Sequence, residues 1–380
     1  MQNKEIIDKC KEASNLLDSY NIAGSLDLLD RIVKDRHDYK AADELNRLRE
    51  TFKYMAEYMV SGFEDNSREN VYNEIIESLR SLLDRITRDV IAIDSSDAYS
   101  ETLRYLNLTN VNIEDLFSKY SSALSELQLA EAADNDTQEL TKRIEGLHET
   151  IFSTIWVSLG DKRLSERVSS SVISQKYGEV LAAHMISALT LSLLGYFDRY
   201  KLLALLKIYQ AGVSEKISAR ALVGIILTLN RHPERSVNIK DVALPLEAMQ
   251  DSLIDYRRVR EVIMALIRTR DTDRISTKMK EEVIPEIMKL QPDILKKMRE
   301  ASPENLDGGG MEYNPEWEEM LNKSGLTEKM RELSDMQSDG ADLMMVAFSN
   351  LKQFSFFNSV ANWFLPFSSS HSAITSGEKE

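Results

Sequence analysis

The chain has 380 residues, of which 43% are hydrophobic and 29% charged, proportions typical of a soluble globular protein and not of a disordered or fibrous one. One hydrophobic core rarely extends over 380 residues, so the length predicts either several domains or an elongated array of helical pairs. The formal net charge of −15 argues against a nucleic-acid-binding surface, because such a surface needs clustered Lys and Arg to displace counterions from phosphates.

Cysteine content and the first residues bear on the compartment. The single cysteine, Cys10, cannot form an intramolecular disulfide and fits a reducing environment. The opening stretch MQNKEIIDKCKEASNLL lacks the apolar run of a secretory signal, so we expect a cytoplasmic location. Residues 180–197 carry no formal charge over about the length of a membrane span, but their polar side chains and the lack of a positive flank favour a buried core helix.

Residues 1–150 form a predicted N-terminal helical-repeat region. Between residues 4 and 58 apolar side chains recur at steps of three and four, with breaks near residues 20–21 and 37–38. After a polar linker at 61–67, similar spacing predicts helices over 71–91, 103–108, 113–129 and 140–159. The helix, short turn and helix of residues 25–55 have the rhythm of a tetratricopeptide-like pair.

Residues 151–300 form a predicted central α-solenoid core. Residues 179–229 are the densest apolar stretch of the chain, and they predict three short helices over 180–194, 202–209 and 221–229. Residues 231–235 read as a turn, and helical spacing resumes over 244–268 and 275–298. Because the sequence shows no alternating strand pattern, we predict an all-α fold, an α-solenoid of antiparallel helical hairpins of the TPR or HEAT kind.

The C-terminal part divides into three predicted pieces. Residues 301–313 contain Gly308, Gly309 and Gly310 and are expected to form a glycine-rich linker. Residues 314–367 are expected to form a helical and aromatic segment that caps the solenoid. Residues 368–380 are small and polar, and we expect them to be disordered.

The sequence contains no recognisable catalytic, metal or cofactor motif. His148-Glu149 lacks the second histidine of HExxH, and no GxSxG, CxxC or phosphate-binding glycine loop occurs. The histidines are scattered without metal-ligand spacing, and the arginines between residues 257 and 274 alternate with acidic residues, which favours ion pairs over an anion-binding groove. An enzyme pocket assembled from distant helices around His184, Tyr209 or the arginines remains an alternative.

The C-terminal aromatic cluster is the sharpest candidate for a binding surface. Aromatic and methionine side chains dominate the energetic centres of protein interfaces. The same residues could instead pack against the last helices as a cap, while insertion into a membrane surface is disfavoured by the lack of neighbouring Lys and Arg. The predicted partner-binding residues are Phe354, Phe356, Phe357, Trp363, Phe364 and Phe367.

Several stretches together resemble a known helical module. RALVGIILTL, EEVIPEIMKLQPDIL, NPEWEEML and SDGADLMMVAFSNLKQFSFFNSVANWFLPF are similar to the module of uncharacterised bacterial tetratricopeptide-repeat-type proteins, over roughly residues 150–367. The resemblance implies an α-solenoid without catalytic residues, in which further helical repeats often follow the NWFLPF segment. We therefore expect a non-enzymatic scaffold that binds another protein or associates with itself, and that binds neither nucleic acid nor a membrane.

Overall fold

The computed structural model describes residues 3–61, 68–109, 111–237, 239–250, 252–269, 277, 281, 331, 354–367 and 371–374. These residues form helices and contain no β-strand, so the all-α prediction is confirmed for the described part of the chain. The predicted linker 301–313 and residues 314–330 and 332–353 lie outside it. The chain divides into two compact units, one of Met1–Tyr256 with Asn358–Glu380 and one of Arg257–Phe357.

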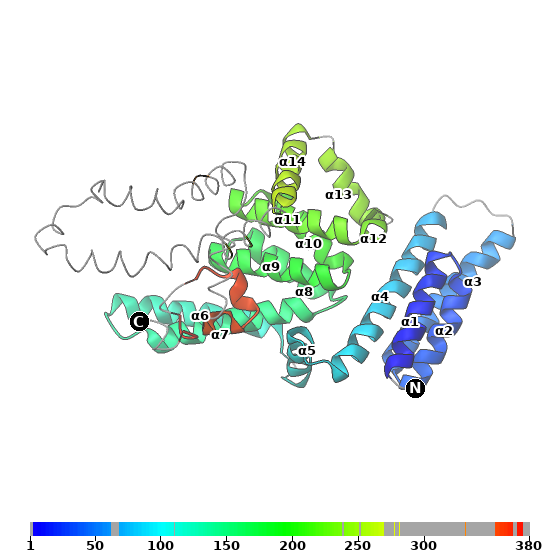
Figure 1. The fold of residues 1–380 in the computed structure, drawn as a ribbon, viewed down its shortest axis with the longest axis horizontal. Coiled ribbons are helices and arrows are strands. Elements are labelled where there is room, and N and C mark those ends of the chain that lie inside the picture. The colour runs from blue at the N-terminus through cyan, green and yellow to red at the C-terminus, as the bar shows by residue number, and fades with distance from the viewer. Residues whose placement is uncertain are drawn as a thin grey trace, which may run out of the picture. The chain divides into compact units, whose positions relative to one another are not determined.

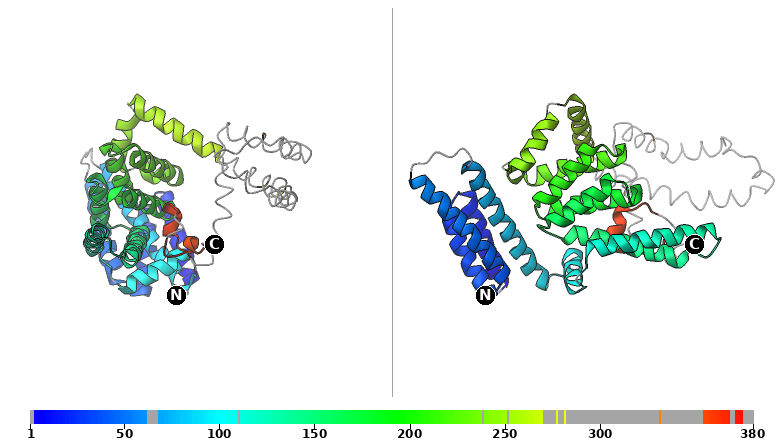
Figure 2. Two further views of the ribbon diagram at one scale, coloured as in Figure 1. Left: turned by 90° about the vertical axis from the view of Figure 1, so that its left-hand side faces the viewer. Right: turned by 180° about the vertical axis from the view of Figure 1, so that it is seen from behind.

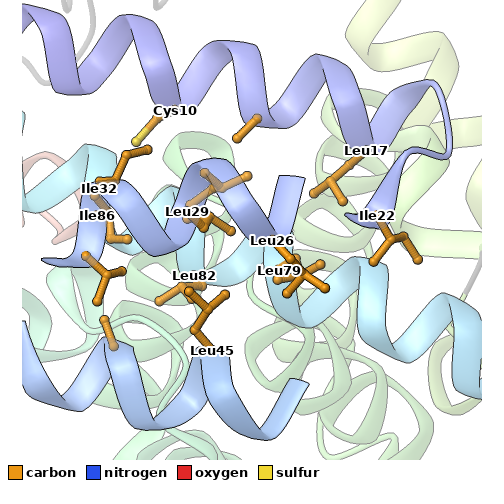
Figure 3. Packing of buried hydrophobic residues seen from close by; sticks show 14 of the residues in the cluster. Cys10, Leu17, Ile22, Leu26, Leu29, Ile32, Leu45, Leu79, Leu82 and Ile86 are labelled. Carbon is orange, nitrogen blue, oxygen red and sulfur yellow. The ribbon is translucent and has the colours of Figure 1, made fainter. Parts of the chain in front are cut away.

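The first four helices of the larger unit, α1 (Asn3–Asp18), α2 (Ile22–Arg36), α3 (Tyr39–Val60) and α4 (Arg68–Asp94), pack around one apolar core (Figure 1). Figure 3 shows leucine side chains from all four helices meeting there, among them Leu17, Leu29, Leu45 and Leu82. The core also encloses Cys10, whose thiol pKa is raised by burial.

The helix breaks of this region are confirmed, and polar caps explain them. Asn21 accepts a hydrogen bond from the backbone N–H of Gly24 at 2.9 Å, and Asp38 accepts one from Ala41 at 3.0 Å. Each cap satisfies an N–H group that the start of the next helix would otherwise leave without a partner.

Three helices lead from this bundle to the rest of the unit: α5 (Ala98–Thr109), α6 (Ile113–Ala132) and α7 (Gln138–Val157). α5 contacts both α4 and α7, and α6 packs along α7. Tyr99 of α5 meets Trp156 of α7 edge to face, with ring centroids 5.2 Å apart. The helices predicted over 103–108, 113–129 and 140–159 are therefore confirmed, with α5 starting earlier than predicted.

A buried lysine closes the C-terminal end of α7. Lys201 has none of its surface exposed, and its Nζ donates to Ile155 O at 2.7 Å, to Ser158 O at 2.5 Å and to Ser192 Oγ at 2.6 Å. The last carbonyl groups of a helix have no partner within the helix and carry partial negative charge, which favours a cation there. Burial nevertheless lowers the pKa of Lys201 to about 8.

The densest apolar stretch forms the predicted three helices, α9 (Gly178–Gly195), α10 (Arg199–Ala211) and α11 (Glu215–Arg231), preceded by α8 (Lys162–Ile173). α9 lies between α7 and α11, whereas α10 packs against α8 and α11 (Figures 1 and 2). Neighbours on several sides explain why α9 is apolar all round. Of the described residues, one helix, Gly178–Gly195, is long and apolar enough to cross a membrane, and more than half of it is buried inside the protein.

The helices after α11 depart from the prediction. Residues 231–235 were predicted as a turn, but α11 continues to Arg231 and Pro233 begins a short helix, α12 (Pro233–Val237). Proline suits the first position of a helix, since its missing N–H would be without a partner there. Residues 244–268 divide between α13 (Lys240–Gln250) and α14 (Leu253–Arg268).

Candidate binding groove

Helices α9 and α11 run in the same direction, because α10 returns the chain between them. The numbers of the paired residues increase along both helices: Arg220 donates to Ser187 Oγ at 2.7 Å, and further along the chain His232 Nε2 donates to Leu193 O at 2.8 Å. Ser214 starts α11 by accepting a hydrogen bond from the N–H of Ile217 at 3.3 Å. The two helices are therefore neighbours over most of their lengths.

Gly224 permits the closest approach of these two helices. A Cβ atom at this position would overlap the side-chain oxygen of Thr190 and would lie 3.1 Å from Leu205 Cδ1. Thr190 in turn donates to Ile186 O at 2.9 Å, which fixes its hydroxyl on α9. The missing side chain thus lets α11 lie directly against α9.

Above this contact, α9, α11 and the C-terminal segment enclose an elongated groove of about 910 Å³. Its surface is mainly apolar, with small side chains such as Ala183 and Ala219 among larger ones, and it carries few charged groups. The groove is lined by Glu179, Val180, Ala183, Ser187, Thr190, Leu191 and Leu194 of α9, by Lys216, Ala219, Arg220, Val223, Gly224 and Leu227 of α11, and by Trp363, Phe364, Leu365 and Pro366.

The C-terminal segment forms the third wall because it docks on α7 and α9. A short 3₁₀-helix, η4 (Ala361–Phe364), contacts both helices (Figure 2). His184 Nε2 donates to Ala361 O at 2.8 Å, and Ser359 Oγ donates to Glu149 Oε1 at 2.6 Å. Residues 371–374, inside the stretch expected to be disordered, also reach α7, where Ser372 N donates to Glu145 Oε2 at 3.1 Å.

The structure places the six predicted aromatic residues in different surroundings. Phe364 stacks on the buried Phe152 of α7 with ring centroids 5.4 Å apart, and its neighbour Trp363 is 42% exposed. Both line the groove, whereas Phe367 is exposed beyond it.

The other three predicted aromatics belong to the smaller unit, around η3 (Ser355–Asn358). Phe356 and Phe357 are buried and meet edge to face at 4.9 Å, while Phe354 is half-buried. Of the six residues, Trp363 and Phe364 line the groove.

Arg220 is the main charged group at the middle of the groove. Among the described residues no carboxylate lies within ion-pair distance of its guanidinium, which bonds to the Ser187 hydroxyl. Partial burial lowers the pKa of Arg220. Arg199 contrasts with it: burial acts to lower its pKa, but ion pairs with Glu74 and Asp241 raise the pKa overall. Arg220 is thus a cation on a mainly apolar surface, with no ion-pair partner in the described part of the chain.

A second pair of charges lies at one end of the groove. Lys216 Nζ is 3.7 Å from Glu179 Oε2, and Ser214 donates to the same carboxylate at 3.0 Å. Because this lysine and glutamate offset each other, the net charge of the groove wall is set by Arg220.

Two of the histidines, His148 and His184, pack among aromatic rings between α6, α7 and α9. His148 lies 2.9 Å from Tyr120 Oη, and burial lowers its pKa to about 4. His184 stacks on Phe152 at 4.6 Å, and burial lowers its pKa to about 4 as well. The described residues hold no group of three or more His, Cys, Asp or Glu that could bind a metal ion.

The enzyme alternative placed a polar pocket around His184, Tyr209 or the arginines between residues 257 and 274. Tyr209 donates a hydrogen bond to Asp255, and neither His184 nor Tyr209 lines the groove. The described contacts of these two residues are therefore those of side chains that join helices.

Sequence reasoning missed Arg220, Ser187 and Gly224. A weak signal existed, since Lys216, Arg220, Val223 and Leu227 recur at steps of three and four on one helix face. Comparisons with protein-family models, with curated proteins and with solved structures found no match.

Proposed function

We propose that this protein is a non-enzymatic helical scaffold that binds another protein through the groove between α9, α11 and residues 363–366. The observation that carries the proposal is the combination of an open apolar trough with an arginine that has no carboxylate partner among the described residues. Apolar surface gains free energy when a partner removes it from water, and a partly desolvated cation gains an anionic partner at the same time.

The proposal includes an α-solenoid arrangement for residues of the larger unit. The odd-numbered helices α7, α9 and α11 lie side by side, and the even-numbered helices α8 and α10 do the same. Such alternation is what consecutive helical hairpins produce when they stack, and stacked hairpins offer an extended face for docking. The resemblance to tetratricopeptide-repeat-type proteins belongs to this proposal and agrees with a binding role.

Site-specific photo-cross-linking tests the proposed function. A photoreactive amino acid at Val223, on the groove floor, should form an adduct with a distinct partner in native cell extract. The same group at Lys207, which is exposed on α10 and does not line the groove, provides the matched control. The purified partner should then bind the full chain, and Val223→Arg should weaken that binding by about tenfold or more.

Adducts of equal yield and identity from both positions would contradict a specific groove. Absence of any protein adduct from Val223, together with binding of the chain to lipid vesicles, would replace the proposal with membrane association.

A further inference from the structure

The dimensions and spacing of the groove match a helix of about four turns. The lining residues of α9 run from Val180 to Leu194 at steps of three and four, so at 1.5 Å per residue they extend over about 21 Å. The lining residues of α11 run alongside from Lys216 to Leu227 with the same spacing. Two neighbouring helices that present such ridges form a trough into which the side chains of a third helix can pack.

The backbone of the groove walls also favours a helical occupant. α9 and α11 satisfy their own interior N–H and C=O groups, so the trough offers side chains and few free backbone groups along its length. An extended peptide would lose backbone hydrogen bonds to water there without replacement. A helix brings its backbone already satisfied and buries only side chains.

Charge indicates where the occupant needs an acidic residue. Arg220 bonds to Ser187, which stands midway between Val180 and Leu194 on the α9 wall. No described carboxylate pairs with this guanidinium, whereas Arg235 donates two hydrogen bonds to Glu77 and one to Asp84. A carboxylate on the occupant would supply the missing partner at the centre of the trough.

The neighbouring part of the same surface already binds an apolar segment of this chain. η4 lies on α7 and α9 with Phe364 stacked on Phe152, and it ends at the open trough between α9 and α11. The groove is therefore continuous with an existing apolar contact of the protein.

Building on the proposed function, we propose that the groove binds an amphipathic helix of a partner protein that carries one acidic residue at its centre. Apolar side chains of that helix at i, i+3 or i+4 and i+7 occupy the trough, and the acidic side chain pairs with Arg220.

Designed peptides test the charge preference directly. The probes are three labelled amphipathic helical peptides of about 16 residues, identical except for Glu, Gln or Lys at the centre of the apolar face. Fluorescence anisotropy with the full chain should show the Glu peptide binding about tenfold more tightly than the Gln peptide, with the Lys peptide weaker still. Arg220→Glu should reverse this order, and Arg220→Gln should abolish the preference.

Arg163→Glu is the matched control, because Arg163 is exposed on α8 and does not line the groove. It makes the same charge change and should leave the order of the peptides unaltered. Circular dichroism of each variant checks that the helices persist.

Two results would overturn the acidic helix. Equal affinities for the three peptides, or no binding of any of them, would contradict the proposed acidic helix. If a photoreactive group at Val223 still cross-links a partner protein in that case, the proposed function stands without an acidic helix as the ligand. Self-association of the chain that disappears in Arg220→Glu, measured by sedimentation velocity, would identify a second copy as the occupant instead.

Discussion

His184 fixes the C-terminal segment to α9 through a single hydrogen bond made in apolar surroundings. Its Nε2–H donates to Ala361 O at 2.8 Å, so in the neutral ring the buried Nδ1 is the unprotonated nitrogen, and it has no hydrogen-bond partner among the described residues. Arg220 of α11, and His148 of α7 when it is protonated, oppose a positive charge on His184. Burial, the largest cause, together with these neighbours lowers the pKa from the ordinary 6.5 to about 4.

This depressed pKa predicts a loss of stability in mild acid. The unfolded chain takes up a proton at His184 below about pH 6.5, whereas the folded chain resists protonation down to about pH 4, so stability falls as the pH falls through this window. His184→Gln keeps an N–H donor for Ala361 but does not titrate. When the pH is lowered from about 7 to 4.5, the free energy of unfolding falls in both proteins. We expect the fall to be about 2 kcal/mol smaller in His184→Gln than in wild type.

Urea unfolding at the two pH values measures this difference. Because the other titrating groups are common to both proteins, their effects cancel in the comparison. Equal losses in wild type and variant would show that His184 is protonated as easily in the folded chain as in the unfolded one.

From the sequence, individual residues could be singled out as candidates, but their contacts in the folded chain could not be predicted. His184 and the C-terminal aromatics could be singled out, but not that His184 would bond to Ala361, 177 residues away. Nor could the sequence show that Phe364 would face Phe152, or that Arg220 would pair with no carboxylate of the described residues. Such relations depend on which helices become neighbours, and local spacing does not encode that.

At the scale of elements, the contact between α9 and α11 depends on Gly224. Gly146, in the middle of α7, provides a matched control, because a Cβ atom at this position would meet nothing within 4 Å. A glycine inside a helix costs about 0.5 to 1 kcal/mol relative to alanine. At the crowded position of Gly224, the close packing that the missing side chain allows offsets this cost.

The two glycines therefore predict opposite effects of alanine. Gly224→Ala should destabilise the protein by about 1 to 3 kcal/mol, because the new methyl group forces α11 away from Thr190 and Leu205. Gly146→Ala should stabilise it by about 0.5 to 1 kcal/mol. Chemical denaturation of both variants measures the change, and stabilisation by both would mean that α9 and α11 have room between them.

Helix boundaries show which local signals were sufficient. The three helices of residues 179–229 were predictable because long apolar runs end at Gly195 and Gly212, and Asp198 and Ser214 cap the helices that follow. α8 was not singled out, since serines separate its apolar Leu164, Val168 and Val172. α12 was predicted as a turn because a proline can either interrupt a helix or begin one.

On the scale of the whole molecule, the chain returns from the smaller unit to pack on α7 and α9. Ala361 and Asn362 are buried there, and Ile374 is 5% exposed. One face of this segment covers Phe152 and His184, while Trp363 on the other face borders the groove. The segment therefore covers α7 and α9 with one face, and its other face borders the groove that we propose as a binding surface.

Truncation separates these two roles. A chain that ends after Phe357 loses the cover over Phe152 and His184, and it should be destabilised by on the order of 2 to 4 kcal/mol, with increased binding of an apolar dye. A chain that ends after Ile374 keeps every described contact of the segment and should melt like the full chain.

Within the segment, Phe364→Ala should reproduce part of the loss of stability, because its ring stacks on Phe152. Trp363→Ala should change stability by less than about 0.5 kcal/mol and weaken peptide binding, because its ring is 42% exposed and borders the groove. Equal melting of the full chain and the chain ending after Phe357 would show that the segment contributes nothing to folding, and would leave the groove without its third wall in solution.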